Sequence, residues 1–279
     1  MFKTVGAAIG ALMLCTMALP AVAQNLTDEQ IAEALDFADS NAVMVLYHEI
    51  GHLLVGELNL PVLGKNEDAA DSLSALMLLE EPEGEWADVV LRDAANGWYL
   101  SPFNGDEVPG DWAFMGEHSL DKQRAYFFVC MMVGAKPDFY AELAEEWGLD
   151  EDRRSRCEST FAQAQSSWHT VLEPHLLGEG TPVGQITVTY EDAGDYEQFA
   201  ETLRSSSFLE SAATLVTDNY VIPRDLVFRA EQCGEANAFY SPSQEAVIFC
   251  YEYMAKLADL YLASLTTTAE EEASAETAE

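Results

Sequence analysis

The segment from Ala42 to Leu58 constrains this chain most, because it is apolar nearly all round yet carries titratable side chains in its middle. A helix that is apolar on every side is expected inside a protein rather than on its surface. The side chains in the middle of the segment are those of His48, Glu49 and His52. Because burying such groups without partners is unfavourable, the sequence predicts a central buried helix whose polar residues act together.

His48 and His52 are the histidines of an HExxH pattern, which reads HEIGH here. On a helix, residues four apart lie one turn apart on the same face, which suits two ligands of one Zn²⁺. Glu49 then lies beside the open coordination position, where a carboxylate can act as a general base toward water. We therefore expect zinc as the cofactor, with a third ligand elsewhere in the chain.

Glu67 is the predicted third zinc ligand. It begins a segment expected to be helical from Glu67 to Glu80, and Asp71 follows it on the same helical face. Asp71 is expected to accept a hydrogen bond from the ring nitrogen of His48 that does not bind metal, which would fix the orientation of the ring. The alternative for Glu67 is a solvated acid that the dipole favours at the start of a helix.

This arrangement resembles the gluzincin peptidases, in which HExxH is followed by ExxxD on the next helix. The resemblance rests on His48, Glu49 and His52, followed by Glu67 and Asp71. It implies a zincin-like fold and a water molecule activated by Glu49. The short interval between the two motifs implies that their helices lie close together.

Residues 237–240 read NAFY and precede Ser-Pro and an apolar run. They resemble a segment of the neprilysin family of zinc endopeptidases, in which the edge strand of a sheet binds extended substrate. The resemblance implies that the side chain of Asn237 and the backbone of Ala238 hold the peptide, with Tyr240 in the same substrate-binding strand. A free strand edge offers N–H and C=O groups for this purpose. The alternative is an ordinary hairpin closed by a disulfide.

His118 is followed by a serine and, six residues on, by Arg124, after which a helix is expected. This segment resembles the HS-x4-R segment of the neprilysin family. The resemblance implies that His118 donates to the oxyanion of the tetrahedral intermediate and that Arg124 binds a substrate carbonyl. Donors of this kind suit amide hydrolysis, because negative charge develops on the carbonyl oxygen. The alternative for His118 is a surface or helix-capping histidine.

The order of these segments differs from that of neprilysin, where the NAFY strand precedes HExxH. The resemblance therefore implies a circularly permuted fold, which can preserve a site when the termini of a domain lie close together. The whole layout also resembles a bacterial family described as "putative metallopeptidase". The blocks that carry this resemblance are HExGH, EDAAD, EHxLDxQR, CGExNAFY and CYE, spread over residues 48 to 252.

The pattern of elements predicts an α+β fold that is mostly helical with a small sheet. A first helix should open with a capping box at Thr27, and a second helix is expected to start at Asn41. Irregular structure is expected from Pro82 to Pro109. Further helices are expected at 119–134, 137–147, 153–177, 195–217 and 251–265, with strands at 183–190, 226–228 and within 233–250. Residues 24–265 are expected to form one domain.

Beyond Cys15 the chain has four cysteines, Cys130, Cys157, Cys233 and Cys250. Sequence order suggests pairing Cys130 with Cys157 and Cys233 with Cys250, one of three possible connectivities. The alternative is free buried thiols. None of them has the close spacing of zinc-binding cysteine pairs.

The two ends of the chain read differently from its middle. Residues 1–23 resemble a signal peptide, with Lys3 before an apolar run and small residues before an expected cleavage site that precedes Gln24. The alternative is a first transmembrane helix, which the short run and Pro20 disfavour. We therefore expect export to the periplasm or outside the cell, without stable membrane insertion after cleavage. Residues 266–279 are acidic and lack bases, so they are expected to be disordered.

The formal net charge of −36 excludes nucleic acid as an expected partner. The sequence thus predicts a zinc-dependent metallopeptidase with a peptide or protein substrate and leaves the oligomeric state open. One alternative is a metal-binding or interaction protein without turnover. Another is a zinc hydrolase that acts on a non-peptide amide or ester.

Overall fold

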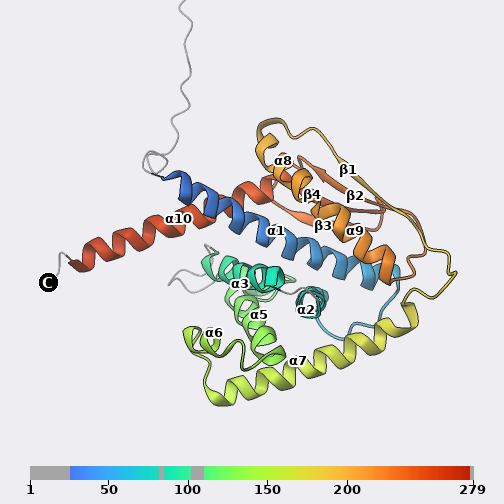
Figure 1. The fold of residues 1–279 in the computed structure, drawn as a ribbon, viewed down its shortest axis with the longest axis horizontal. Coiled ribbons are helices and arrows are strands. Elements are labelled where there is room, and N and C mark those ends of the chain that lie inside the picture. Colours follow the sequence, from blue (N-terminus) through green and yellow to red (C-terminus); the bar gives the residue numbers. More distant parts are fainter. Residues whose placement is uncertain (1–25, 82–84, 102–109, 277–279) are drawn as a thin grey trace, which may run out of the picture.

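The computed structural model describes residues 26–81, 85–101 and 110–276 (Figure 1). The predicted signal peptide at 1–23 lies outside the described residues. Within the described part the fold is α+β, mostly helical with a four-stranded mixed sheet, as predicted.

A 30-residue helix, α1 (Asp28–Glu57), runs through the middle of the molecule (Figure 1). Thr27 caps its start in the predicted capping box. The predicted restart at Asn41 is wrong, because the helix continues through it. The buried amide of Asn41 donates to the main-chain oxygens of Phe37 (2.9 Å) and Asp93 (3.2 Å), so its polar group is satisfied without ending the helix.

Helix α1 lies between two apolar cores, which explains why it is apolar nearly all round. Leu46, Ile50 and Leu53 belong to the core shared with the sheet, whereas Met44 and Tyr47 belong to the core shared with the other helices. A helix between two cores has no solvated face along this part of its length. The predicted central buried helix is confirmed.

The helices on one side of α1 form the helical half of the molecule (Figure 1). They are α2 (Asn66–Leu79), α3 (Glu85–Leu100), α4 (Asp111–Met115), α5 (Asp121–Ala135), α6 (Ala141–Glu146), α7 (Glu151–Leu172) and the short η3 (Glu173–His175). The expectation of irregular structure from 82 to 109 is wrong for α3. Its buried residues Ala87, Val90, Leu91, Ala94 and Ala95 have helical spacing, and this face packs into the second core.

The sheet lies on the other side of α1, with strand order β1-β2-β4-β3. Its strands are β1 (Ile186–Tyr190), β2 (Leu226–Glu231), β3 (Ala238–Ser241) and β4 (Ala246–Cys250). Strand β2 pairs in parallel with β1 on one side and with β4 on the other. Strand β3 pairs with β4 in an antiparallel hairpin and forms one edge of the sheet. The predicted paired strands within 233–250 are confirmed.

Two segments depart from the predicted helices. The single helix expected at 195–217 is divided into η4 (Gly194–Tyr196), α8 (Glu197–Ser206) and α9 (Phe208–Asn219), with Ser207 between the last two at φ +56°. The last helix, α10 (Tyr251–Glu276), continues past the predicted end at 265 into the acidic segment. Glutamate and alanine are good helix formers, which favours this continuation.

Both predicted disulfides are present. Cys130–Cys157 joins α5 to α7, and Cys233–Cys250 closes the segment that contains the β3–β4 hairpin. Among the described helices, none is long and apolar enough to cross a membrane.

Candidate metal centre and substrate cleft

Helices α1 and α2 meet at the glycine of the HEIGH sequence. A Cβ atom placed on Gly51 would lie 3.0 Å from the Cα of Ala70, so only glycine allows this approach without displacement of the backbone. Glu67 and Asp71 flank Ala70 on α2, as His48 and His52 flank Gly51 on α1. The close crossing therefore brings two pairs of polar side chains into contact, as the short interval between the motifs predicted.

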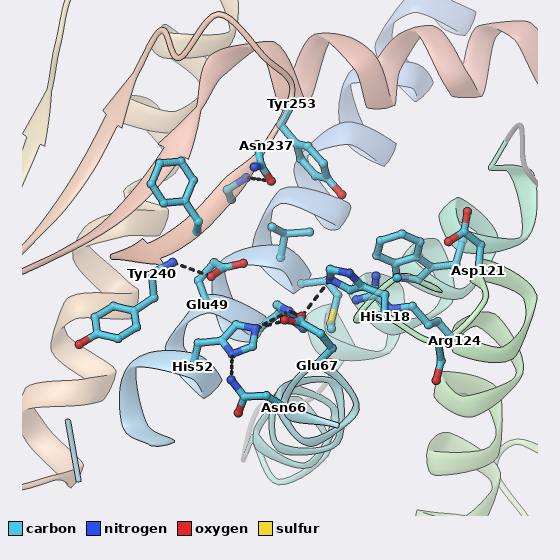
Figure 2. Close-up of a pocket in the computed structure, with 18 of the residues that line it drawn as sticks. Glu49, His52, Asn66, Glu67, His118, Asp121, Arg124, Asn237, Tyr240 and Tyr253 are labelled. Carbon is cyan, nitrogen blue, oxygen red and sulfur yellow. Dashed lines mark hydrogen bonds and ion pairs between the residues drawn. The ribbon is translucent and has the colours of Figure 1, made fainter. Parts of the chain in front are cut away.

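Three side-chain atoms converge at this crossing (Figure 2). Nε2 of His48 lies 3.0 Å from Nε2 of His52, and each nitrogen lies 3.1 Å from Oε2 of Glu67. His48 is buried, and the other two side chains are mostly covered. These three residues form a group that could hold a metal ion.

The spacing of this group fits a tetrahedral metal site. Ligands about 2.0–2.1 Å from a zinc ion lie about 3.3 Å from one another, close to the separations within this group. Two imidazoles and one carboxylate also form a donor set that zinc accepts. Neutral ring nitrogens and a carboxylate oxygen repel one another at 3 Å unless a proton or a cation lies between them. The residues present therefore fit the predicted ion.

Asp71 fixes the ring of His48 from behind. Its Oδ1 lies 2.8 Å from Nδ1 of His48, and the same carboxylate accepts two hydrogen bonds from Arg124, Nη2 at 2.7 Å and Nε at 2.8 Å. With the proton of His48 on Nδ1, its Nε2 lone pair faces the convergence point. This is the position predicted for Asp71.

The charges in this cluster influence one another. Burial alone would raise the pKa of Asp71, but Arg124 and His48 outweigh it and lower that pKa to about 2. Burial alone would lower the pKa of His48, but its hydrogen bonds to Asp71 and Glu67 raise it to about 9. Burial would also raise the pKa of Glu67, yet hydrogen bonds from His118, His48 and His52 hold it far below its ordinary value. The cluster thus favours a positive charge at its centre.

Asn66 contacts the other ligand ring and was not predicted. Its side-chain amide lies 3.2 Å from Nδ1 of His52 (Figure 2). In the structure the amide nitrogen faces the ring, so its N–H donates to Nδ1. In the opposite amide orientation, Oδ1 would accept the Nδ1 proton and leave the Nε2 lone pair free for metal. Its position directly before Glu67 in the sequence could have indicated this contact, because the neighbour of a predicted ligand lies close to the same site.

Glu49 lies beside the convergence point, buried in α1. Its Oε2 accepts a hydrogen bond of 2.7 Å from the main-chain N–H of Tyr240 on β3. Burial raises the pKa of Glu49, although His48, His52 and this N–H partly offset the effect. A carboxyl group with a raised pKa is better suited to accept a proton near neutral pH.

His118 reaches the same group from outside. Its Nε2 lies 2.9 Å from Oε2 of Glu67, and its side chain is half exposed. Its ring lies parallel to that of His48, with 6.2 Å between centroids. Nζ of Lys65 donates to its main-chain oxygen at 3.1 Å. His118 therefore lies at the mouth of the site rather than behind the ligands.

Arg124 lies near the site in a different environment from the one predicted. It is buried, paired with Asp71, and stacked with its guanidinium 3.6 Å from the ring centroid of Trp98. The sequence resemblance did not indicate the pairing with Asp71. In this arrangement the observed contacts of Arg124 support the orientation of His48.

The edge strand β3 closes the opposite side of the cleft. The main-chain N–H of Tyr240 points to Glu49 rather than to β4, and Ala238, two residues earlier, presents its groups in the same direction. Asn237, which precedes the strand, is exposed beside them, and its Oδ1 accepts the N–H of Ala238 at 3.0 Å. Asn237, Ala238 and Tyr240 thus border the group that could hold a metal ion.

The side chain of Tyr240 belongs to a second cluster that was not predicted. Its hydroxyl donates to Glu57 at the end of α1, and Glu57 also pairs with Arg224 at 2.5 Å. Arg224 contacts Glu245 at 2.7 Å and the main-chain oxygen of Pro242 at 3.2 Å. This cluster fastens the hairpin to α1 and thereby positions the strand edge.

All of these residues surround a cleft of about 970 Å³. Its lining includes the metal-binding group, Glu49, His118 and Arg124 as well as residues 236–240. A cleft of this size admits a segment of extended peptide or a small molecule. The helical half and the sheet each contribute one wall, and α1 forms the floor.

Comparison with known proteins agrees with this arrangement. A search of curated proteins and a search of solved structures each found no match to the chain. The model of one family, DUF4344, matches residues 9–172 and 190–279, which span the metal-binding group, His118 and the edge strand. By this match, the chain belongs to the family described as "Putative metallopeptidase".

Proposed function

We propose that this protein is a zinc-dependent peptidase that hydrolyses peptide bonds in the cleft between α1 and β3. The observation that carries the proposal is the convergence of His48, His52 and Glu67 beside the buried carboxylate of Glu49. Zinc, when bound, would polarise the scissile carbonyl and acidify a water molecule. The family membership supports the same class of reaction.

Glu49 would move the proton in this reaction. Its carboxylate accepts a proton from the attacking water as the oxygen bonds to the carbonyl carbon. It then returns that proton to the amide nitrogen as the C–N bond breaks. His118 at the mouth of the site would donate to the carbonyl oxygen as negative charge develops there. Arg124 would act mainly through Asp71, which orients His48.

The edge of β3 would align the substrate. An extended peptide can donate to the outward C=O groups of Ala238 and Tyr240, whose N–H groups already donate to Asn237 and Glu49. The side chain of Asn237 would bind the peptide backbone as well. This assignment corresponds to a zincin-like fold in which the strand follows the metal motif in the sequence, a permuted order relative to neprilysin. The antiparallel hairpin and its position over α1 support it.

The test compares Glu49→Gln with the wild type. The variant should bind one zinc per chain, because Glu49 is not a ligand, but should lose hydrolysis of a peptide library by at least about 100-fold. Glu158→Gln, a change at an exposed acid on α7, serves as a control and should retain activity. Hydrolysis by Glu49→Gln at the wild-type rate would contradict the mechanism.

The two alternatives give different results in the same assay. A metal-binding or interaction protein would bind zinc tightly but cleave no peptide. A hydrolase of other amides or esters would cleave those compounds and leave peptides intact. The presence of both a buried general base and a strand edge beside the metal-binding group favours peptide hydrolysis.

We also propose that the protein is exported. The two disulfides support an oxidising compartment such as the periplasm or the exterior of the cell. Export is tested by measuring free thiols in protein purified from its native compartment. Reaction of Cys130, Cys157, Cys233 and Cys250 with a thiol reagent would contradict it.

A further inference from the structure

Lysines gather at the cleft of an otherwise strongly acidic chain. The sequence has 13 lysines and arginines against 49 acids. The described residues include four lysines, and two of them, Lys122 and Lys256, line the cleft. A third, Lys65, contacts the main-chain oxygen of His118 at the mouth of the site. The positive charges at the cleft therefore contrast with the negative net charge of the molecule as a whole.

The two lining lysines keep their charges available. Both are exposed, and neither forms an ion pair with the residues that the structure describes. Nζ of Lys122 lies 5.2 Å from the ring centroid of Tyr99, a contact that leaves the charge uncompensated. Glu252 precedes Lys256 by one helical turn, but its carboxylate accepts N–H groups from Cys233 (3.2 Å) and Gly234 (2.8 Å) instead.

The neighbours of both lysines indicate where they lie in the cleft. Lys256 follows Tyr253 by one turn of α10, and Lys122 follows Asp121 at the start of α5. In Figure 2, Asn237 lies between Tyr240 and Tyr253, and Asp121 lies on the far side of His118 from Tyr240. From these neighbours we infer that both lysines lie toward the Asn237 end of the cleft. Asp121 also lines this end, and its carboxylate accepts a hydrogen bond from Ser101.

The direction of β3 relates this end to the direction of a bound peptide. The strand runs from Ala238 to Ser241, and its pairing with β4 is antiparallel. A peptide that adds to the free edge in the same antiparallel manner runs from Ser241 toward Asn237. Its residues after the scissile bond then lie at the end of the cleft that carries Lys122 and Lys256.

We propose that Lys122 and Lys256 bind a carboxylate on the C-terminal side of the scissile bond, so that preferred substrates are peptides with an acidic side chain or a free C-terminus there. The inference rests on the proposed peptide hydrolysis. The acidic surface does not prevent such recognition, because at physiological salt charges more than about 8 Å apart are largely screened. The lysines, in contrast, lie within the cleft itself.

The experiment uses zinc-loaded protein and matched quenched peptides. One pair differs by Glu or Gln in the two positions after the scissile bond, and another by a free or amidated C-terminus, which separates the two sources of carboxylate. Two exposed ion pairs predict a preference of about fivefold to tenfold in kcat/KM for the charged peptide. The same Glu placed before the scissile bond should give no such preference.

Variants then connect the preference to the lysines. Lys122→Gln with Lys256→Gln should reduce the ratio of kcat/KM for charged and neutral peptides to about one, and Arg at both positions should restore it. Lys136→Gln, which removes the same charge from a separate hollow beside Glu85 and Asp88, should leave the ratio unchanged. An unchanged ratio in the double variant, or no preference in the wild type, would overturn the inference.

A binding measurement separates this inference from the proposed function. Zinc-loaded Glu49→Gln protein is titrated with the same peptide pairs in a calorimeter. Tighter binding of the charged peptide that disappears in the lysine variants supports the inference even if no peptide is hydrolysed. Equal binding of both peptides contradicts it, whether or not the wild type is a peptidase.

Discussion

The metal-binding corner and the substrate edge of the cleft are built in opposite ways. The corner comes from residues 48–71 on two consecutive helices, and its polar atoms are buried and paired. The edge comes from β3, whose Tyr240 contacts Glu49 across 191 residues of sequence. It is held by a disulfide and by the cluster around Glu57, and it presents backbone groups to the cleft.

This difference separates two tasks. Metal binding needs fixed side chains, which adjacent helices can supply once their crossing is close enough. Substrate alignment needs a free strand edge, which only the assembled sheet can supply. Changes in the corner should therefore alter metal affinity and stability together, whereas changes at the edge should alter substrate binding and leave the metal in place.

The largest effect is expected from Asp71→Asn. It leaves the buried charge of Arg124 unpaired, which should lower the free energy of unfolding by about 3–5 kcal/mol. It also weakens the support of His48, so zinc affinity should fall about 10-fold to 100-fold. Thermal unfolding and a competition assay with a zinc chelator measure the two losses. Asp68→Asn on the exposed side of α2 is the control, and equal losses there would contradict the assignment.

Removing the Cys233–Cys250 disulfide with two serines tests the edge. The closed loop is short, with a sequence separation of 17, and its loss should cost about 3 kcal/mol of stability. KM for peptides should rise because the hairpin that bears β3 is less constrained. Zinc affinity below the unfolding temperature should stay near the wild-type value. A parallel loss of zinc would show that the two regions are not separate.

Gly51→Ala tests the helix crossing with the smallest possible side chain. The added Cβ would meet the backbone of Ala70 at 3.0 Å. Overpacking of about 1–3 kcal/mol should exceed the gain of about 1 kcal/mol in helix propensity, and zinc affinity should fall as Glu67 moves. Gly64→Ala is the matched control, because nothing lies within 4 Å of its Cβ position. Tighter zinc binding by Gly51→Ala would refute the role of the crossing.

Asp39→Asn changes α1 outside both regions and should have the smallest effect. Burial, together with the charge of Asp36, raises the pKa of Asp39 to about 6, and its Oδ1 has no hydrogen-bond partner among the described residues. An acid whose pKa is higher in the folded state destabilises the protein above that pKa. The variant should therefore be more stable by about 1 kcal/mol at pH 7.5, after allowance for solvent screening.

The same variant should lose its advantage as the pH falls from about 6 to below 4, because Asp39 is protonated first in the folded protein and then in the unfolded chain. Thermal unfolding at several pH values measures this, and a constant difference would contradict the assignment. At each pH, the zinc affinity and KM of the variant should equal those of the wild type. Asp39→Asn thus provides a reference for stability effects that involve neither the corner nor the edge.

The sequence predicted the corner well because its geometry is local. HEIGH and the Glu67–Asp71 spacing specify helical faces, and helical faces follow from sequence alone. The paired strands around Ala238 and both disulfides were also predicted. The helix α3 was missed because its flanking glycine and proline residues concealed the helical spacing of its buried face.

Contacts between distant elements could not be predicted. Nothing in the sequence around Arg124 shows that it pairs with Asp71, because that contact depends on how α5 packs against α2. The same holds for Tyr240 and Glu57, which meet only when the hairpin lies on α1. Asn41 was mistaken for a helix boundary because its buried partners lie on α1 and α3.

The direct passage from β4 into α10 has a further consequence. Cys250 ends the strand and Tyr251 begins the helix, with no loop between them. The strand that we propose to align the peptide is therefore joined through β4, without a loop, to the helix that carries Lys256. If Lys256 binds the terminal carboxylate of a substrate, its separation from Glu49 sets the number of residues after the scissile bond. The fragments released from the C-terminal ends of different substrates should then share one length.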